Sequence, residues 1–229
     1  MADNFAIKWD QTGEREFETG TDRGVLYPMS SGSYGDGVAW NGLTAVTESP
    51  SGAEANAIYA DNMKYAELRS AEEFGGTIEA YMYPDEFAEC DGSAEVATGV
   101  YIGQQDRKKF GFTYRTKVGS DTDTAATDYK IHIVYGATAS PSEKSYQTIN
   151  DSPEAITFSW EFTTTPVTVE DYKNTSVITI QKSKVGDDTK LEELETILYG
   201  TPGDPTASPA VEEVKGRLPL PAEVIEIFS

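Results

Sequence analysis

The feature that most constrains this chain is a succession of short strand-like segments, separated by turn residues, up to about residue 183. About ten such segments are recognisable from β-branched and aromatic residues that alternate with polar ones. They cover residues 5–9, 24–28, 37–49, 56–68, 76–83, 99–104, 108–118, 129–137, 155–164 and 176–182. This pattern predicts a mainly β protein built as an antiparallel β-sandwich or incomplete barrel.

Two short helices interrupt the strand pattern. Residues 84–91 begin with a proline and acidic residues and end before a glycine, which is typical of a short helix. Residues 187–200 give a stronger pattern, in which Thr189 and Glu192 match a capping box and three leucines share one face. We therefore expect a short helix that flanks the β domain and a second helix near the C-terminus.

The composition changes after this second helix. Residues 201–217 combine prolines with small and polar residues, as an extended linker does. Residues 218–229 are apolar again, which a disordered tail would not require. In this C-terminal arm the expected docking residues are Leu218, Leu220, Val224, Ile225 and Phe228. We expect a β domain at 1–183 and a C-terminal part at 184–229, whose arm docks either on its own body or on a neighbouring copy.

A glycine- and serine-rich stretch within residues 30–45 is interpreted as a long hairpin loop. It carries Tyr34 and Trp40 and continues to Leu43. Loops usually carry polar residues, so aromatic side chains here indicate contacts with another surface. We expect these three side chains to become buried on assembly, which offsets the cost of ordering the loop.

The charge of the chain restricts its partners. The net charge is −21, with acids spread along the whole sequence. Binding to the outside of a nucleic acid or to an anionic membrane is disfavoured, because Lys and Arg are not in surplus. No apolar run approaches the ~20 residues that span a bilayer, and the first residues lack the pattern of a signal peptide. We expect the chain to be made in a reducing cytoplasm and not to associate with a membrane.

Residues suited to catalysis or metal binding are scarce. The chain has one histidine, His132, in a strand-like segment, and one cysteine, Cys90, in the expected short helix. A single Cys and a single His cannot build the usual zinc site, and the acids of residues 85–95 lack the spacing of a calcium loop. We therefore expect no catalytic residue, no metal and no cofactor. A β-sandwich hydrolase is the least favoured alternative, because histidine is scarce, cysteine is single and the sequence shows no carboxylate motif.

Several ordered segments of the chain resemble the major tail proteins of long-tailed bacteriophages, in the phi13-like group. They are GVAWNGLTAVTESPSGAEANAIYADNMKY, GTIEAYMYPDEFAECDG, KKFGFTYRTKVGSDT and YKIHIVYGATASPSEKSYQTINDSPEAITFSWEFTTTPV. The ending LEELETILYGT…RLPLPAEVIEIF also looks like the end of that group. The resemblance covers nearly the whole chain. It rests on ordered segments and not on a catalytic signature, so it indicates a family but no chemical site.

The resemblance implies a phage tail tube fold and a structural virion protein without enzymatic activity. Such proteins self-assemble into rings, usually hexameric, which stack into the tail tube of a siphovirus-type phage, the conduit for DNA ejection. Implied partners are further copies of the chain and the tail-tip or initiator and terminator proteins. The tape measure protein and DNA would pass through an acidic lumen without specific binding. The protein would be made in the bacterial host cytoplasm and reside in the virion tail.

By the same resemblance, residues 30–45 would be the ring-stacking hairpin, 84–91 the flanking helix and 218–228 a second arm. Glu67 and Glu79, as polar alternates of expected inner strands, are candidates for acids that face the lumen. Like charges along a pore keep DNA hydrated and unattached. The alternative function is a non-catalytic β-sandwich module that binds carbohydrate or another ligand through exposed aromatic residues.

Overall fold

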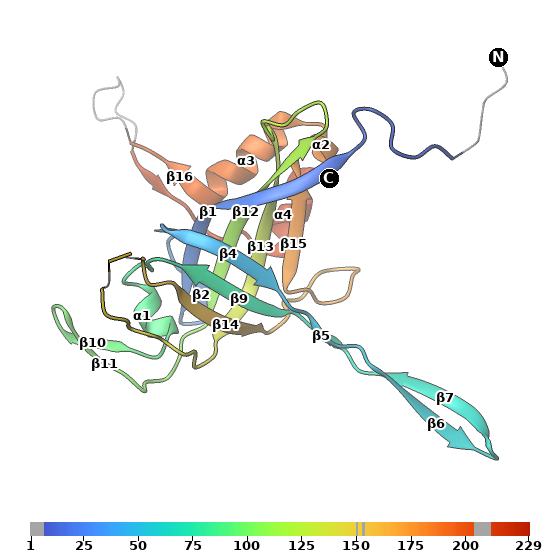
Figure 1. Cartoon of the computed structure of the whole chain (residues 1–229), viewed down its shortest axis with the longest axis horizontal. Coiled ribbons are helices and arrows are strands. Elements are labelled where there is room, and N and C mark those ends of the chain that lie inside the picture. The colour runs from blue at the N-terminus through green and yellow to red at the C-terminus, as the bar shows by residue number, and fades with distance from the viewer. Residues whose placement is uncertain (1–6, 150, 153, 204–211) are drawn as a thin grey trace.

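The computed structural model describes residues 7–149, 151–152, 154–203 and 212–229. Its largest element is a nine-stranded antiparallel sheet of order β2-β1-β12-β13-β14-β9-β4, with β3 beside β1 and β15 beside β13 (Figure 1). The strands of this sheet are β1 (Glu16–Ser30), β2 (Ser33–Tyr34), β3 (Val38–Trp40), β4 (Leu43–Glu48), β9 (Gly75–Ala80), β12 (Phe110–Ser120), β13 (Asp128–Ala139), β14 (Phe158–Thr164) and β15 (Val177–Gln181). The expected mainly β, antiparallel class is confirmed.

One face of the curved sheet encloses an aromatic core. Trp40 lies at its centre, with ring centroids 4.6 Å from Phe87 and 5.7 Å from Trp160. Alternation along β9 places Ile78 and Ala80 in the same core, as the sequence pattern predicts. The helix α1 (Phe87–Cys90) covers this core with its buried phenylalanine. The expected flanking helix is therefore present, as a single turn.

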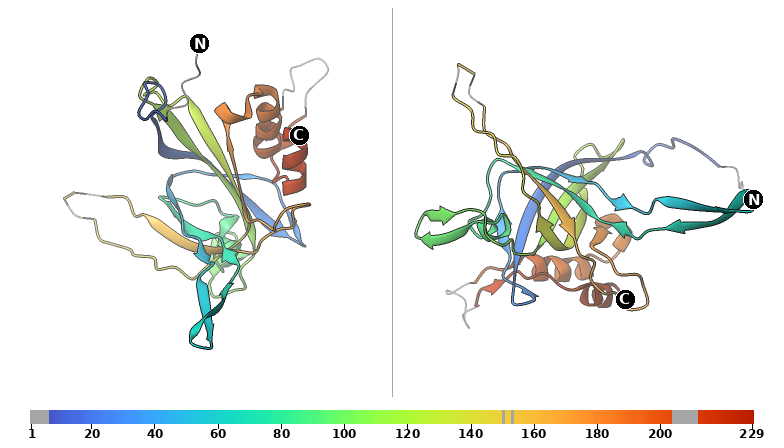
Figure 2. Two further views of the ribbon diagram at one scale, coloured as in Figure 1. Left: turned by 90° about the vertical axis from the view of Figure 1, so that its right-hand side faces the viewer. Right: turned by 90° about the horizontal axis from the view of Figure 1, so that it is seen from below.

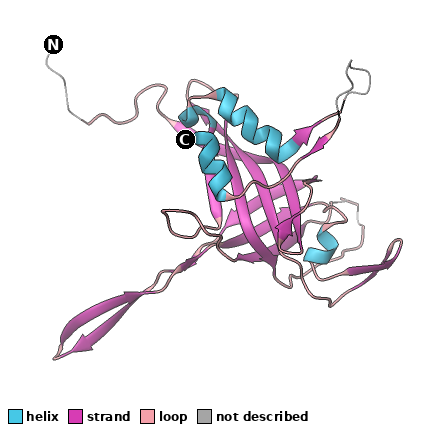
Figure 3. Ribbon diagram, turned by 180° about the vertical axis from the view of Figure 1, so that it is seen from behind, coloured by secondary structure: helices cyan, strands magenta, loops and turns pink. Residues whose placement is uncertain are grey.

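The opposite face of β1, β12, β13 and β15 packs against helices (Figure 3). These are α2 (Lys182–Val185), α3 (Asp188–Tyr199) and α4 (Pro221–Phe228). Ile131 and Ile133 of β13 contribute to this second core together with Leu194 and Leu198 of α3. The C-terminal part of the chain thus shares one hydrophobic core with the β domain.

Gly136 shifts the alternation of side chains along β13, where Val134 before it already faces the aromatic core. Before it, Ile131 and Ile133 face the helices, and after it Ala137 faces the aromatic core. Its φ is 60°, and an added Cβ would lie 2.3 Å from the Thr165 carbonyl oxygen, so only glycine fits. The bulge at this glycine lets β13 pair with β15 along its first part and with β14 along its last.

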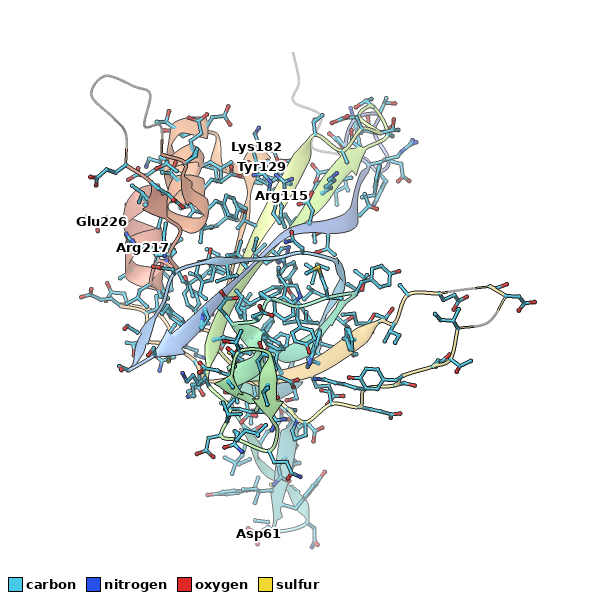
Figure 4. All side chains as sticks on the ribbon, turned by 90° about the vertical axis from the view of Figure 1, so that its left-hand side faces the viewer. Asp61, Arg115, Tyr129, Lys182, Arg217 and Glu226 are labelled. Atoms are coloured by element: carbon cyan, nitrogen blue, oxygen red, sulfur yellow. The ribbon has the colours of Figure 1, made fainter. Side chains whose placement is uncertain are left out.

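A cluster of cations and an aromatic ring joins the sheet to the helices. The Tyr129 ring has the Arg115 guanidinium at 4.6 Å and the Lys182 ammonium at 5.6 Å from its centroid. Figure 4 shows these three side chains together at one end of the molecule. The Tyr129 hydroxyl donates to Glu195 of α3 at 2.6 Å. The cluster therefore connects β12 and β13 with α2 and α3.

Smaller paired segments leave the main sheet in different directions (Figure 2). They are β5 (Ser51–Gly52) with β8 (Glu72–Glu73), β6 (Ala55–Ala60) with β7 (Met63–Arg69), β10 (Ala94–Ala97) with β11 (Val100–Ile102), and β16 (Gly200–Thr201) with β17 (Val214–Lys215). Within the described part of the chain, no helix is long and apolar enough to cross a membrane.

Three local expectations require correction. Residues 7–9 are not in a strand, and the remainder of the expected strand 5–9 lies outside the described residues. The cap of α3 is Asp187, whose carboxylate accepts the Thr189 backbone N–H at 2.9 Å, so Thr189 is already helical and forms no capping box. Residues 56–68 form a hairpin and not a single strand. The expected linker falls partly on residues 204–211, outside the described residues.

Candidate assembly surface

The described residues offer no cluster suited to metal chemistry. In those ranges no group of three or more His, Cys, Asp or Glu side chains could hold a metal ion. Cys90 is fully buried in the aromatic core, and burial raises the pKa of its thiol to about 12. A thiol in that state is a poor nucleophile, so Cys90 is a packing residue here.

His132 belongs to a polar network that joins strands. Its ring stacks on Tyr114 at 4.5 Å between centroids, and its Nε2 lies 3.0 Å from the Thr116 hydroxyl. Its Nδ1 lies 3.5 Å from a carboxylate oxygen of Glu48. Burial lowers the pKa of His132, while the nearby carboxylates of Glu48 and Glu18 oppose that shift. The His132 side chain is 11% exposed and connects β4, β12 and β13.

Residues 30–45 fold onto the body, so the expectation of a long, exposed hairpin there is wrong. Trp40 is 3% exposed and its indole N–H donates to a backbone carbonyl at 3.0 Å. Tyr34 is half-buried and its hydroxyl accepts the Gly136 backbone N–H at 2.9 Å. Leu43 packs against the aromatic core. These side chains anchor the chain's own fold because β2 and β3 pair with β1.

The segment that does project is residues 49–74, here named the projecting hairpin. It leaves the body through the β5–β8 pair and ends in the β6–β7 ribbon, and Figure 4 places Asp61 at its far end. Asp61 and Asn62 have φ of 51° and 61°. Two consecutive left-handed residues are what a tight two-residue turn requires. This Asp-Asn pair was the available signal for a hairpin within residues 56–68.

One face of the projecting hairpin is aliphatic. The register of β6 and β7 places Ile58, Met63 and Leu68 on this face with Ala60 and Ala66, and the polar Asn56 lies at its edge opposite Leu68. The three large side chains are 41%, 64% and 57% exposed. A single two-stranded ribbon is at most marginally stable in water, and an exposed apolar patch marks an interaction site. The aliphatic face is therefore the strongest candidate contact surface of the chain.

The opposite face of the ribbon is polar. Glu67 forms ion pairs with Lys64 and Arg69, and the hydrogen bonds from these cations hold the pKa of Glu67 below its ordinary value. Tyr59, which is paired with Lys64, lies on the same face. Glu67 thus sits on the projecting hairpin and not on the main sheet, and its role as a lumen-facing acid stays a prediction.

Glu79 lies on the outer face of β4, β9 and β14, opposite the aromatic core. Its neighbours across the strands are Ala45 and Ser159. Glu161, also on this face, is exposed. The three strands contain no Lys or Arg, so the surface is acidic and polar. The position of Glu79 on the lumen of an assembly stays a prediction.

A second exposed apolar hairpin, β10–β11, leaves the body away from the projecting hairpin (Figures 1 and 2). Its exposed large side chains are Val96, Val100, Tyr101 and Ile102. The two hairpins place apolar surface on different sides of one body, which suits contacts to more than one neighbour.

Within the single chain, part of the C-terminal arm packs on its own body. Leu218 and Val224 are buried, at 5% and 3% exposure, in the core beneath α3 and α4. Phe228 is partly buried there. Leu220 and Ile225 are exposed at 54% and 41%, so these two predicted docking residues do not pack inside the chain.

Comparisons with known proteins place the chain in no family, since neither the protein-family models nor the curated proteins give a match.

Proposed function

We propose that this chain is a non-enzymatic structural subunit that assembles with copies of itself into stacked rings forming a bacteriophage tail tube. The observation that carries the proposal is the uncovered aliphatic face of the projecting hairpin, on a body whose own two cores are filled. The choice of a tail tube rests on the resemblance of the ordered segments to major tail proteins.

The direction of the hairpin supports assembly into rings or tubes. The projecting hairpin extends from one end of the body (Figure 1), and in the proposed assembly its aliphatic face would contact a different surface of the next copy. Such heterologous contacts generate closed rings or open-ended assemblies. Ile58, Met63 and Leu68 are each about half exposed. Covering them would contribute about 3 kcal/mol per hairpin, from roughly half of the 1.5–3 kcal/mol for complete burial of each.

The acidic balance also fits this function. The net charge is −21, and the outer face of β4, β9 and β14 carries Glu79 and Glu161 without a basic residue on those strands. A conduit lined by such a face would let DNA pass without adhering to it.

Electron microscopy across a concentration series tests the proposal. We expect the purified chain to form rings or hollow tubes, with light scattering giving the mass. A chain with Ile58→Ser and Leu68→Ser should stay monomeric, because its aliphatic face is lost, and should keep the circular dichroism of the folded body. The matched control is Tyr59→Ser, on the opposite face of the ribbon.

Two outcomes would contradict the proposal. If the double variant forms rings as well as the wild type does, the aliphatic face is not the surface that drives assembly. A wild-type chain that stays monomeric in the presence of tail-tip proteins, and that binds oligosaccharides on a glycan array, would favour a ligand-binding module.

A further inference from the structure

The two strands that carry the projecting hairpin are fixed to the body by different chemistry. On the outgoing side, Glu48 is the last residue of β4 and accepts a hydrogen bond from the Tyr114 hydroxyl at 2.5 Å. Tyr114 is 3% exposed and is held by its stack on His132. The Glu48 side chain is 41% exposed. A surface carboxylate is thus tied to a rigid phenol in the core.

On the return side, the fixed residue is Phe74, just before β9. Its ring lies 6.4 Å from that of Phe162 in the aromatic core. Its carbonyl accepts the Thr164 hydroxyl at 2.7 Å. This attachment is mainly apolar packing, which tolerates small rotations better than a short, directional hydrogen bond does.

The backbone ladder of the main sheet ends at the root of the projecting hairpin, where Glu48 pairs with Gly76 and Gly75 pairs with Thr163. The Ser49 backbone N–H donates to the Gly75 carbonyl at 2.8 Å, and the next residue is Pro50, which has no N–H to donate. Beyond it, β5 and β8 pair over only two residues each. Beyond these last ladder pairs, the side-chain attachments at Glu48 and Phe74 are what fix the direction of the hairpin.

We propose that the Tyr114–Glu48 hydrogen bond is a latch that sets the direction of the projecting hairpin, with Phe74 as its pivot. Asp61 lies thirteen residues after Glu48, so at about 3.3 Å per residue the lever is about 40 Å long. A rotation of about 10° at the root would move the tip by about 7 Å. Opening the latch thus changes which surface of another copy the aliphatic face can reach.

Spin-label distance measurements on the full-length chain test the latch, at a dilution where the chain is monomeric. The labels go on Tyr65→Cys, exposed on the projecting hairpin, and Glu193→Cys, exposed on α3. Cys90 stays in place because it is fully buried. We expect a narrow distribution of distances between the two labels in the parent chain. In the Tyr114→Phe variant this distribution should be at least twice as wide. Hydrogen exchange at the Ser49 amide should accelerate about tenfold, as loss of one charge-assisted hydrogen bond implies.

The matched control is Tyr27→Phe, which removes a hydroxyl that donates to the Leu198 carbonyl at 2.8 Å on the helix side of the sheet. It should leave the hairpin distribution as in the parent. Should Tyr114→Phe fail to fold, Glu48→Ala opens the same latch from the surface and should broaden the distribution equally. Unchanged distributions in the latch variants, or equal broadening by Tyr27→Phe, would overturn the proposal. Because the readout uses monomers, it is independent of the proposed assembly.

Discussion

Replacing Gly216 by alanine is expected to loosen the C-terminal arm from the body. Gly216 is buried where the chain crosses the end of α3, and an added Cβ would lie 2.2 Å from the Leu198 carbonyl oxygen. A carbon–oxygen contact is ordinarily no shorter than about 3.3 Å. The two backbones must therefore separate by about 1 Å. No rotamer change can relieve this clash, because the backbone fixes the position of the alanine Cβ and its partner is a main-chain carbonyl oxygen.

The expected cost follows from the contacts that the separation breaks. The Gly37 N–H donates to the Gly216 carbonyl at 2.7 Å, and the Arg217 N–H donates to the Ile197 carbonyl at 2.8 Å. Each such bond contributes about 0.5–1.5 kcal/mol, and partial exposure of Leu218 adds about 1 kcal/mol. We expect the free energy of unfolding to fall by about 3 kcal/mol, which lowers Tm by about 6–12 °C for a chain of this size.

Thermal melts and urea unfolding, followed by circular dichroism, measure this effect. The control is Gly103→Ala, since a Cβ at Gly103 would meet no atom within 4 Å. It should change stability by no more than about 0.5 kcal/mol. Limited proteolysis after Arg217 should be faster in Gly216→Ala than in the control. A Gly216→Ala protein that melts within about 2 °C of the wild type would refute the close crossing at α3.

Three further outcomes follow from the buried residues. Trp40→Ala should lower the free energy of unfolding by about 3–5 kcal/mol. Trp9 is 75% exposed, so Trp9→Ala should change this free energy little. Equal effects of the two substitutions in urea titrations would contradict the core position of Trp40. Acidification below about pH 6.5 should lower the free energy of unfolding, because His132 takes up a proton near that pH in the unfolded chain, whereas burial lowers its pKa in the folded chain. An equally large loss of stability in His132→Asn would exclude this histidine as the cause. Cys90 should react slowly with iodoacetamide in the native chain and rapidly in urea, and rapid native labelling would disprove its burial.

Several features of the fold could be predicted from the sequence because they are local. The alternation of β9, with Ile78 directed inward and Glu79 outward, is observed as expected. The helix at 187–200 is also observed, because its leucines repeat at helical spacing and Gly200 ends it. The antiparallel class followed from short strands and frequent turns.

The exposed hairpin was predicted at the wrong residues because a local pattern does not reveal what covers a side chain. Trp40 follows a glycine-rich stretch, and only the pairing of β3 with β1 shows that it enters the aromatic core. Ile58 and Leu68 have the alternation of a core strand, yet no element of the described chain covers them. The Asp61–Asn62 turn was a local signal, and it was missed inside a longer apolar pattern.

The sequence by itself determined the strand-rich class, the acidic surface and the apolar C-terminal arm, because residue alternation, charge and composition act over short distances. Tertiary structure alone decided that part of this arm packs on its own body and that residues 49–74 project while residues 30–45 do not. Both outcomes depend on long-range contacts: the pairing of β2 and β3 with β1 holds residues 30–45 on the body, and the crossing at Gly216 seats the arm on α3. Strand partners and backbone crossings of this kind leave no periodic trace in the residues that form them.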